Sequence, residues 1–149
     1  MIKIRNFLAV IGVLLAIPAW AVNYTDNGNG TVTDTRTKLV WQQTDDGVQR
    51  TWEGAIAYCE GLSLGGAIDW RLPNYKALLS LVDDSRSNPA IDPIFGNNNS
   101  PFFYWTSTTI PGQTPPNGLA AAVFFEQGTG AQDNKVNPYS LARCVRGGN

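Results

Sequence analysis

The pattern of hydrophobic and polar positions in the first part of the domain is typical of short β-strands. Apolar and β-branched residues at 31–33 and 39–41 flank a polar stretch that begins with Asp34, a pattern typical of a β-hairpin with a tight turn. Further β-prone runs, separated by loops rich in proline, glycine and polar residues, are 102–109, 120–126 and 140–146. The pattern therefore predicts several short strands.

Two segments instead follow the period of a helix. Thr51 is a predicted N-cap, and the apolar residues after it, including Cys59, share one helix face. Gly61 is expected to end this helix in the manner of a C′ glycine. Asn74 is the predicted N-cap of a second helix, whose apolar stripe runs over 75–82. No internal repeat, linker or low-complexity block interrupts these elements, so the sequence predicts one domain.

The segment Asp69-Trp70-Arg71-Leu72-Pro73 directly precedes the second predicted helix. Pro73 restricts its own φ and favours an extended Leu72, so the chain is expected to arrive straight and then turn. Trp70 would bury a large apolar area, and a buried Arg71 would need carboxylate or carbonyl partners. We interpret the segment as structural framework rather than as a catalytic site.

The first 21 residues have the pattern of a secretory signal peptide. Lys3 and Arg5 precede an apolar run, 7–17, that is too short to cross a bilayer, and Ala19-Trp20-Ala21 is a small-x-small cleavage pattern. An uncleaved N-terminal anchor is the alternative. Cleavage would leave residues 22–149 as a secreted or periplasmic domain, and no later segment is long and apolar enough to span a membrane.

The mature domain is expected to be weakly acidic. Loss of Lys3 and Arg5 leaves 11 − 2 = 9 basic against 12 acidic side chains, a net charge of −3. This balance argues against nucleic acid as a partner, because phosphate binding depends on clustered Lys and Arg. The chain contains no histidine, which excludes catalytic triads with a histidine base and metal sites with imidazole ligands.

Cys59 and Cys144 are the two cysteines of the chain. In an exported domain an even pair is most simply one disulfide, and their wide separation excludes a short metal-binding or redox motif. No motif requires a cofactor. Calcium stays open, because Asp84, Asp92 and Asn97 to Asn99 carry the oxygen ligands that this ion prefers.

Five motifs occur in order along the chain: Gly30-Thr31-Val32-x-Asp34-x-x-Thr37-x-Leu39-x-Trp41, Trp52-x-x-Ala55 with Cys59, Asp69-Trp70-Arg71-Leu72-Pro73, Tyr104-Trp105-x-Ser107-Thr108 and Arg143-Cys144-Val145-Arg146. Together they resemble the Lcl C-terminal domain family, which takes its name from a bacterial collagen-like adhesin and was long catalogued as a domain of unknown function. The resemblance implies a C-type-lectin-like α+β fold with two helices, small antiparallel β-sheets and a disulfide between Cys59 and Cys144. Lys38 departs from the family, which usually has a turn glycine there.

The resemblance also implies an exported, non-catalytic binding or adhesion module for a glycan or a surface protein. The founding adhesin's domain is implicated in binding sulfated polysaccharides and host surfaces, a ligand class that the acidic charge of this chain does not favour. The candidate ligand residues are Asn97, Asn98, Asn99, Ser100, Tyr104 and Trp105, with Asn117 and Asn134 as outliers. Exposed aromatic rings stack on sugars, and amides hydrogen-bond to hydroxyls. The alternative is that Trp105 is a core residue and the asparagines are solvated turn residues.

An enzyme is one alternative function. Related lectin-like folds include formylglycine-generating enzymes, which need reactive cysteines and a metal. The adjacent pairs Asp45-Asp46 and Asp83-Asp84 suit turns better than acid–base catalysis, and no nucleophile–base pair is visible, so an enzyme is disfavoured. The other alternative is a receptor or host-contact protein with diversified loops.

Overall fold

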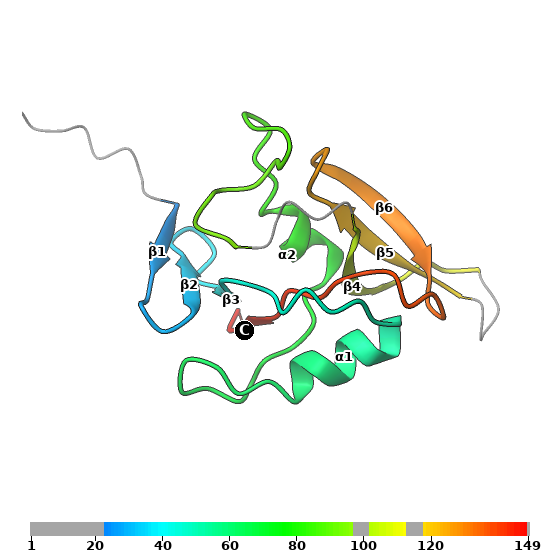
Figure 1. Cartoon of the computed structure of the whole chain (residues 1–149), viewed down its shortest axis with the longest axis horizontal. Helices are drawn as coiled ribbons and strands as arrows, with labels where there is room; N and C mark the ends of the chain where they lie inside the picture. Colours follow the sequence, from blue (N-terminus) through cyan, green and yellow to red (C-terminus); the bar gives the residue numbers. More distant parts are fainter. Residues whose placement is uncertain (1–22, 97–101, 113–117, 149) are drawn as a thin grey trace, which may run out of the picture.

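The computed structural model describes residues 23–96, 102–112 and 118–148. Within them the chain forms two helices and two antiparallel sheets, the predicted α+β arrangement (Figure 1). The first sheet contains Tyr24–Asp26 (β1), Thr31–Asp34 (β2), Val40–Gln42 (β3) and Val145–Arg146 (β7), the second contains Tyr104–Thr109 (β4), Leu119–Phe124 (β5) and Thr129–Asn134 (β6), and the helices are Trp52–Glu60 (α1) and Tyr75–Leu79 (α2). The predicted signal peptide, residues 1–21, lies outside the described residues.

The predicted hairpin is confirmed as the antiparallel pair β2 and β3. Its turn is held by the Asp34 carboxylate, whose Oδ1 accepts hydrogen bonds from the N–H groups of Arg36 and Thr37 at 2.8 and 3.3 Å. Lys38 follows with a φ of 62°, in the left-handed region that side chains disfavour. Glycine adopts such a φ without steric cost, which explains why the family is expected to have a turn glycine at this position.

The first sheet brings the two ends of the domain together, in the strand order β1-β2-β3-β7. β1 lies in a polar stretch with no strand pattern in the sequence, and it forms because all three of its residues pair with β2. The last predicted strand, 140–146, is shorter than expected, since Val145 and Arg146 alone pair with β3. Ser140 and Leu141 instead form single bridges to other segments.

Both helices begin at their predicted N-caps. Thr51 Oγ1 accepts from the Gly54 N–H at 3.2 Å, and Asn74 Oδ1 accepts from the Ala77 N–H at 2.8 Å. α2 has only five residues and is shorter than the predicted stripe. Gly61 does end α1, but its φ of −88° is right-handed, so the expected left-handed C′ conformation was wrong.

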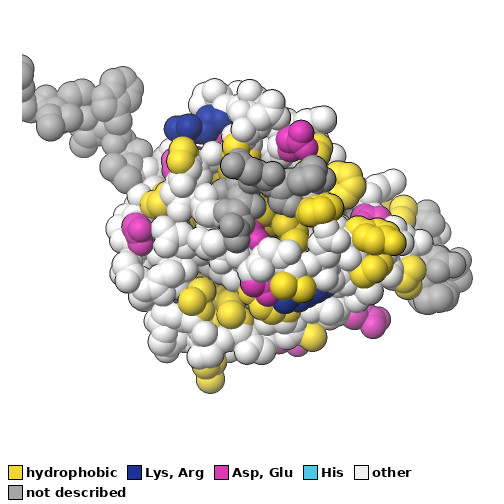
Figure 2. Space-filling model, in the orientation of Figure 1, with side chains coloured by type: hydrophobic (Ala, Val, Ile, Leu, Met, Phe, Trp, Pro, Cys, Tyr) yellow, Lys and Arg dark blue, Asp and Glu magenta, His cyan; other side chains and the backbone are white. Residues whose placement is uncertain are grey.

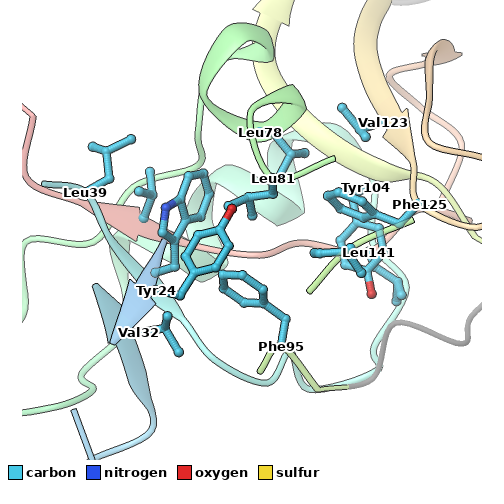
Figure 3. Close-up of a cluster of buried hydrophobic side chains, with 13 residues drawn as sticks. Tyr24, Val32, Leu39, Leu78, Leu81, Phe95, Tyr104, Val123, Phe125 and Leu141 are labelled. Atoms are coloured by element: carbon cyan, nitrogen blue, oxygen red, sulfur yellow. The ribbon is translucent and has the colours of Figure 1, made fainter. Parts of the chain in front are cut away.

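Strands β4 and β5 of the second sheet have a hydrophobic cluster on each face. Successive residues of a strand point to opposite sides of the sheet. Tyr104 of β4 lies in one hydrophobic cluster with Leu78 of α2 and Val123 of β5 (Figure 3). The next residue, Trp105, lies in a second cluster with Cys59 of α1. Each helix therefore covers its own face of this sheet.

β6 was missed in the sequence, because its glycine and polar residues indicate a turn and a loop. It forms because all six of its residues pair with β5. Gly130 leaves room within it for the hydroxyl of Tyr75, which a Cβ at this position would contact. The first residue of α2 thus packs directly on this strand.

Candidate functional site

The predicted polar ligand residues are only partly within the described structure. Asn97 to Ser100 and Asn117 lie outside the described residues. Asn134 is the last residue of β6, and its Oδ1 accepts from the N–H of Val136 at 3.2 Å. Its side chain therefore supports the turn after β6.

The two predicted aromatic ligand residues are core residues. The side chains of Tyr104 and Trp105 are fully buried. The Tyr104 hydroxyl donates to Asp45 Oδ2 at 2.7 Å, and Trp105 Nε1 donates to the carbonyl of Arg50 at 2.8 Å. Neither ring offers a face to a ligand, which agrees with the alternative that Trp105 is core.

A buried ion pair that the sequence did not predict lies beside Tyr104. The side chains of Asp45 and Arg143 are both completely inaccessible to solvent, and Arg143 Nη2 lies 3.0 Å from Asp45 Oδ2. The guanidinium also donates to three backbone carbonyls, those of Gln42, Gln43 and Gly96, at 2.9, 2.6 and 2.8 Å. The buried arginine of this domain is thus Arg143, whereas the sequence had pointed to Arg71.

The ion pair joins segments that are far apart in the chain. Gly96 and Tyr104, which bracket the predicted ligand residues Asn97 to Ser100 in sequence, both bond to it. Burial is the main cause that raises the pKa of Tyr104 far above its ordinary value of 10.0; Arg143 opposes this rise and the Asp45 carboxylate adds to it. The phenol therefore stays protonated and donates to Asp45.

Trp70 has the structural role predicted for it. Its side chain is buried in the second hydrophobic cluster. The indole Nε1 donates to the carbonyls of Leu64 and Ala67, both at 3.2 Å. The ring thereby closes the loop between α1 and the segment Asp69–Pro73.

The other members of this segment tie it to the end of the chain. Arg71 exchanges two backbone hydrogen bonds with Val145 at 2.9 Å, and its side chain donates to the carbonyl of Gly147 at 3.0 Å. Asp69 forms an exposed ion pair with Arg146 at 2.6 Å, and this hydrogen bond holds the pKa of Asp69 below its usual range. Arg71 found the carbonyl partner it was expected to need, but it is only half-buried.

The remaining two residues, Leu72 and Pro73, connect this segment to the second sheet. Leu72 is buried in the second cluster, and the carbonyl of Pro73 accepts from the N–H of Ser107 in β4 at 2.8 Å. Every residue of the predicted framework segment therefore makes a structural contact.

Cys59 and Cys144 form the predicted disulfide, with an S–S distance of 2.04 Å. Both are fully buried, and the bond ties α1 to the residue before β7. Because the chain has no other cysteine, it contains no free thiol. An intact disulfide fits a protein that resides outside the cytoplasm.

Exposed aromatic side chains gather at the start of β4, next to the residues predicted as ligands. Phe102 and Phe103 are 37% and 36% exposed, and Phe103 packs edge-to-face on the half-buried Phe124 of β5 at 5.1 Å between ring centroids. We call Phe102, Phe103 and Phe124 the aromatic patch. Tyr139, 63% exposed, lies on the neighbouring segment, where the Leu141 N–H donates to the carbonyl of Phe103 at 2.8 Å.

Hydrophobic side chains are visible on this side of the molecule in Figure 2, over the region where Figure 1 draws β4, β5 and β6. The aromatic run 102–105 contains both exposed and buried rings: Phe102 and Phe103 are exposed, whereas Tyr104 and Trp105, the two proposed from the sequence as ligand residues, are buried. Strand alternation alone could not say which of its members would be exposed, because that depends on what covers each sheet face.

The acidic pairs considered for catalysis or metal binding are engaged in local contacts. Asp46 bonds to Arg50, and Asp83 bonds to Arg86 at 2.9 Å. Across the described ranges, no group of three or more acidic, histidine or cysteine side chains is placed to hold a metal ion. Because the predicted calcium ligands include Asn97 to Asn99, outside those ranges, calcium binding stays a prediction.

These features define a disulfide-bonded α+β domain in which the conspicuous charged and aromatic motifs build the framework. The chain belongs to the Lcl C-terminal domain family, which matches residues 30–146. This assignment indicates a domain of the kind found at the C-terminus of adhesin-like proteins. No curated protein and no solved structure matches the chain significantly. Among the residues that the structure describes, none of the helices has the length and apolar content needed to cross a membrane.

Proposed function

We propose that this domain is a secreted or periplasmic, non-catalytic binding or adhesion module whose ligand is a glycan or a surface protein. The aromatic patch supports this most directly. Single exposed apolar residues are ordinary, but two exposed phenylalanines adjacent in sequence, one of them packed on a third ring, are typical of an interaction surface. The rings could stack on a sugar or pack against apolar side chains of a protein.

The proposed surface keeps Asn97 to Ser100, which precede Phe102 in the sequence and carry amide and hydroxyl groups. Tyr104 and Trp105 are removed from it, because both are buried. Phe103 and Phe124 take their place as aromatic contact residues.

The chemistry of the two cysteines and of the buried charges supports the proposal that the domain is not catalytic. The formylglycine-generating alternative needs reactive cysteines, and both cysteines of this chain are joined in a buried disulfide. The fully buried side chains of Asp45 and Arg143 neutralise each other and hold backbone groups. Their chemistry is that of a structural ion pair.

The test is a double variant, Phe102→Ala with Phe103→Ala, compared with Ile68→Ala. Ile68 is 78% exposed and lies between α1 and α2, so its replacement removes a comparable apolar side chain from a different element. Binding of the oxidised domain is measured on a glycan array and on immobilised host-surface proteins. We expect the double variant to raise Kd about tenfold or more, because aromatic residues at the centre of an interface carry much of the binding energy.

Ile68→Ala should bind like the unaltered domain. The proposal is refuted if the double variant retains full affinity, or if Ile68→Ala loses as much affinity as the double variant does. Circular dichroism and intact mass verify that each variant is folded and oxidised. The array and the immobilised proteins separate the two ligand classes.

A further inference from the structure

Two fully buried polar atoms at one end of the first sheet lack a protein partner. Asp34 Oδ2 and Trp41 Nε1 make no hydrogen bond with any described residue, and both side chains are inaccessible to solvent. The other carboxylate oxygen of Asp34 is engaged by the turn N–H groups of Arg36 and Thr37. Buried polar groups are almost always hydrogen-bonded, so each of these two atoms requires an explanation.

The strand register places the two side chains on the same face of the sheet. Val32 lies opposite Trp41, and Asp34 donates its N–H to the carbonyl of Leu39 at 2.9 Å. Because side chains alternate along a strand, Asp34 and Trp41 point to the same side as Val32 and Leu39, and they are diagonal neighbours across the pair. Figure 3 shows Val32, Leu39 and Tyr24 at this end of the core. A diagonal neighbour is within reach of a long aromatic side chain.

The two atoms are chemically complementary to one small ligand. The carboxylate oxygen can only accept a hydrogen bond, and the indole N–H can only donate one. A metal cation would satisfy the carboxylate but would be repelled by the N–H donor. A water molecule satisfies both, because it accepts one bond and donates others.

The negative charge of the Asp34 carboxylate affects the pKa of a buried neighbour, Tyr24. Tyr24 lies directly opposite Asp34 in the pairing of β1 with β2. Burial, with the negative charge of Asp34 as the second cause, raises the pKa of Tyr24 to about 12. The strand register thus places the polar groups of Tyr24, Asp34 and Trp41 on one face of the sheet, and a buried water molecule usually makes two to four hydrogen bonds to such groups.

We propose that one internal water molecule bridges Asp34 and Trp41, accepting a hydrogen bond from Nε1 and donating one to Oδ2. This water joins the turn of the β2–β3 hairpin to the hydrophobic core. It gives the Trp41 N–H an acceptor and Asp34 Oδ2 a donor, in addition to the Arg36 guanidinium that lies 3.6 Å from Asp34 Oδ1.

The test is nuclear magnetic resonance of the oxidised domain labelled with ¹⁵N. The indole N–H of Trp41, assigned by its loss in Trp41→Phe, should show a cross-peak to water with the sign of a molecule that tumbles with the protein. Trp105 is the internal control, because it is equally buried and its Nε1 donates to the Arg50 carbonyl. Its indole N–H should show no such cross-peak.

The hydroxyl of Tyr24 could relay the same signal, so the measurement is repeated on Tyr24→Phe. A cross-peak that persists there supports the water, and one that disappears assigns the signal to the hydroxyl and overturns the proposal. Absence of the cross-peak in the unaltered protein also overturns it. A high-resolution crystal structure gives an independent result: density within hydrogen-bonding distance of both atoms supports the proposal, and a direct bond between Nε1 and Oδ2 refutes it.

Discussion

Replacement of Arg143 by methionine tests the main structural conclusion, that one buried ion pair holds the domain's distant segments together. Methionine keeps a long unbranched side chain in the core but removes the guanidinium. The Asp45 carboxylate then stays buried with the Tyr104 hydroxyl but without its cation. Three backbone carbonyls also lose their donor.

The expected loss is large for a domain of this size. Removing one partner of a buried ion pair costs about 3–5 kcal/mol, because the remaining charge is uncompensated. Whole-domain stabilities are about 5–15 kcal/mol, so Arg143→Met should remove a major part of the free energy of unfolding. Asp45→Leu should be similarly damaging, because it removes the carboxylate that neutralises the buried Arg143 guanidinium.

The double variant separates the ion pair from the packing. With both charges removed, neither desolvated ion is left unpaired, so the double variant should be less destabilised than the sum of the two single variants by about 0.5–3 kcal/mol. The free energies come from chemical denaturation of the oxidised proteins, followed by tryptophan fluorescence. Arg146→Met is the matched control, because its ion pair with Asp69 lies on the surface and should matter little.

Either of two results would refute the stabilising role of the Asp45–Arg143 ion pair. Arg143→Met could prove as harmless as Arg146→Met, which would show that the buried pair contributes no more than an exposed one. Alternatively, the two single variants could be strictly additive, which would show that Asp45 and Arg143 act independently.

Two further predictions concern the hairpin turn and the buried phenols. Lys38→Gly should stabilise the domain by about 0.5–1 kcal/mol, because the steric cost of a side chain in the left-handed region exceeds the extra entropy that glycine adds to the unfolded chain. Lys38→Val should lower the melting temperature. A higher melting temperature for Lys38→Val than for Lys38→Gly would contradict the strain at φ 62°. The pKa values of Tyr24, Tyr58 and Tyr104 are all raised above 10.0, chiefly by burial, and that of Tyr24 reaches about 12. Folding therefore favours the neutral phenols, and this stabilisation is complete below pH 10 and lost as the pH rises toward 12. In an alkaline titration, the tyrosinate absorbance of the folded protein should rise at higher pH than that of the unfolded chain. Ionisation of all five tyrosines together near pH 10 would contradict the predicted shifts.

Features that depend on neighbouring residues were predicted well. The Asp34 turn, the N-caps Thr51 and Asn74 and the hairpin of β2 and β3 each arise from hydrogen bonds over a few residues. The disulfide was also predictable, because two cysteines can pair with each other in only one way. β6 was missed, since its polar residues form a strand only because β5 provides the pairing partners.

The sequence by itself determined the local turns, the caps, the cysteine pair and the presence of an aromatic segment at 102–105, because each depends on residue type and short spacing. Only the tertiary structure decided which aromatic residues are exposed and which charge is buried. Tyr104 and Trp105 are both hidden because α1 and α2 cover opposite faces of one sheet. Arg143 meets Asp45 across 98 positions of sequence, and no local pattern carries information over such a separation.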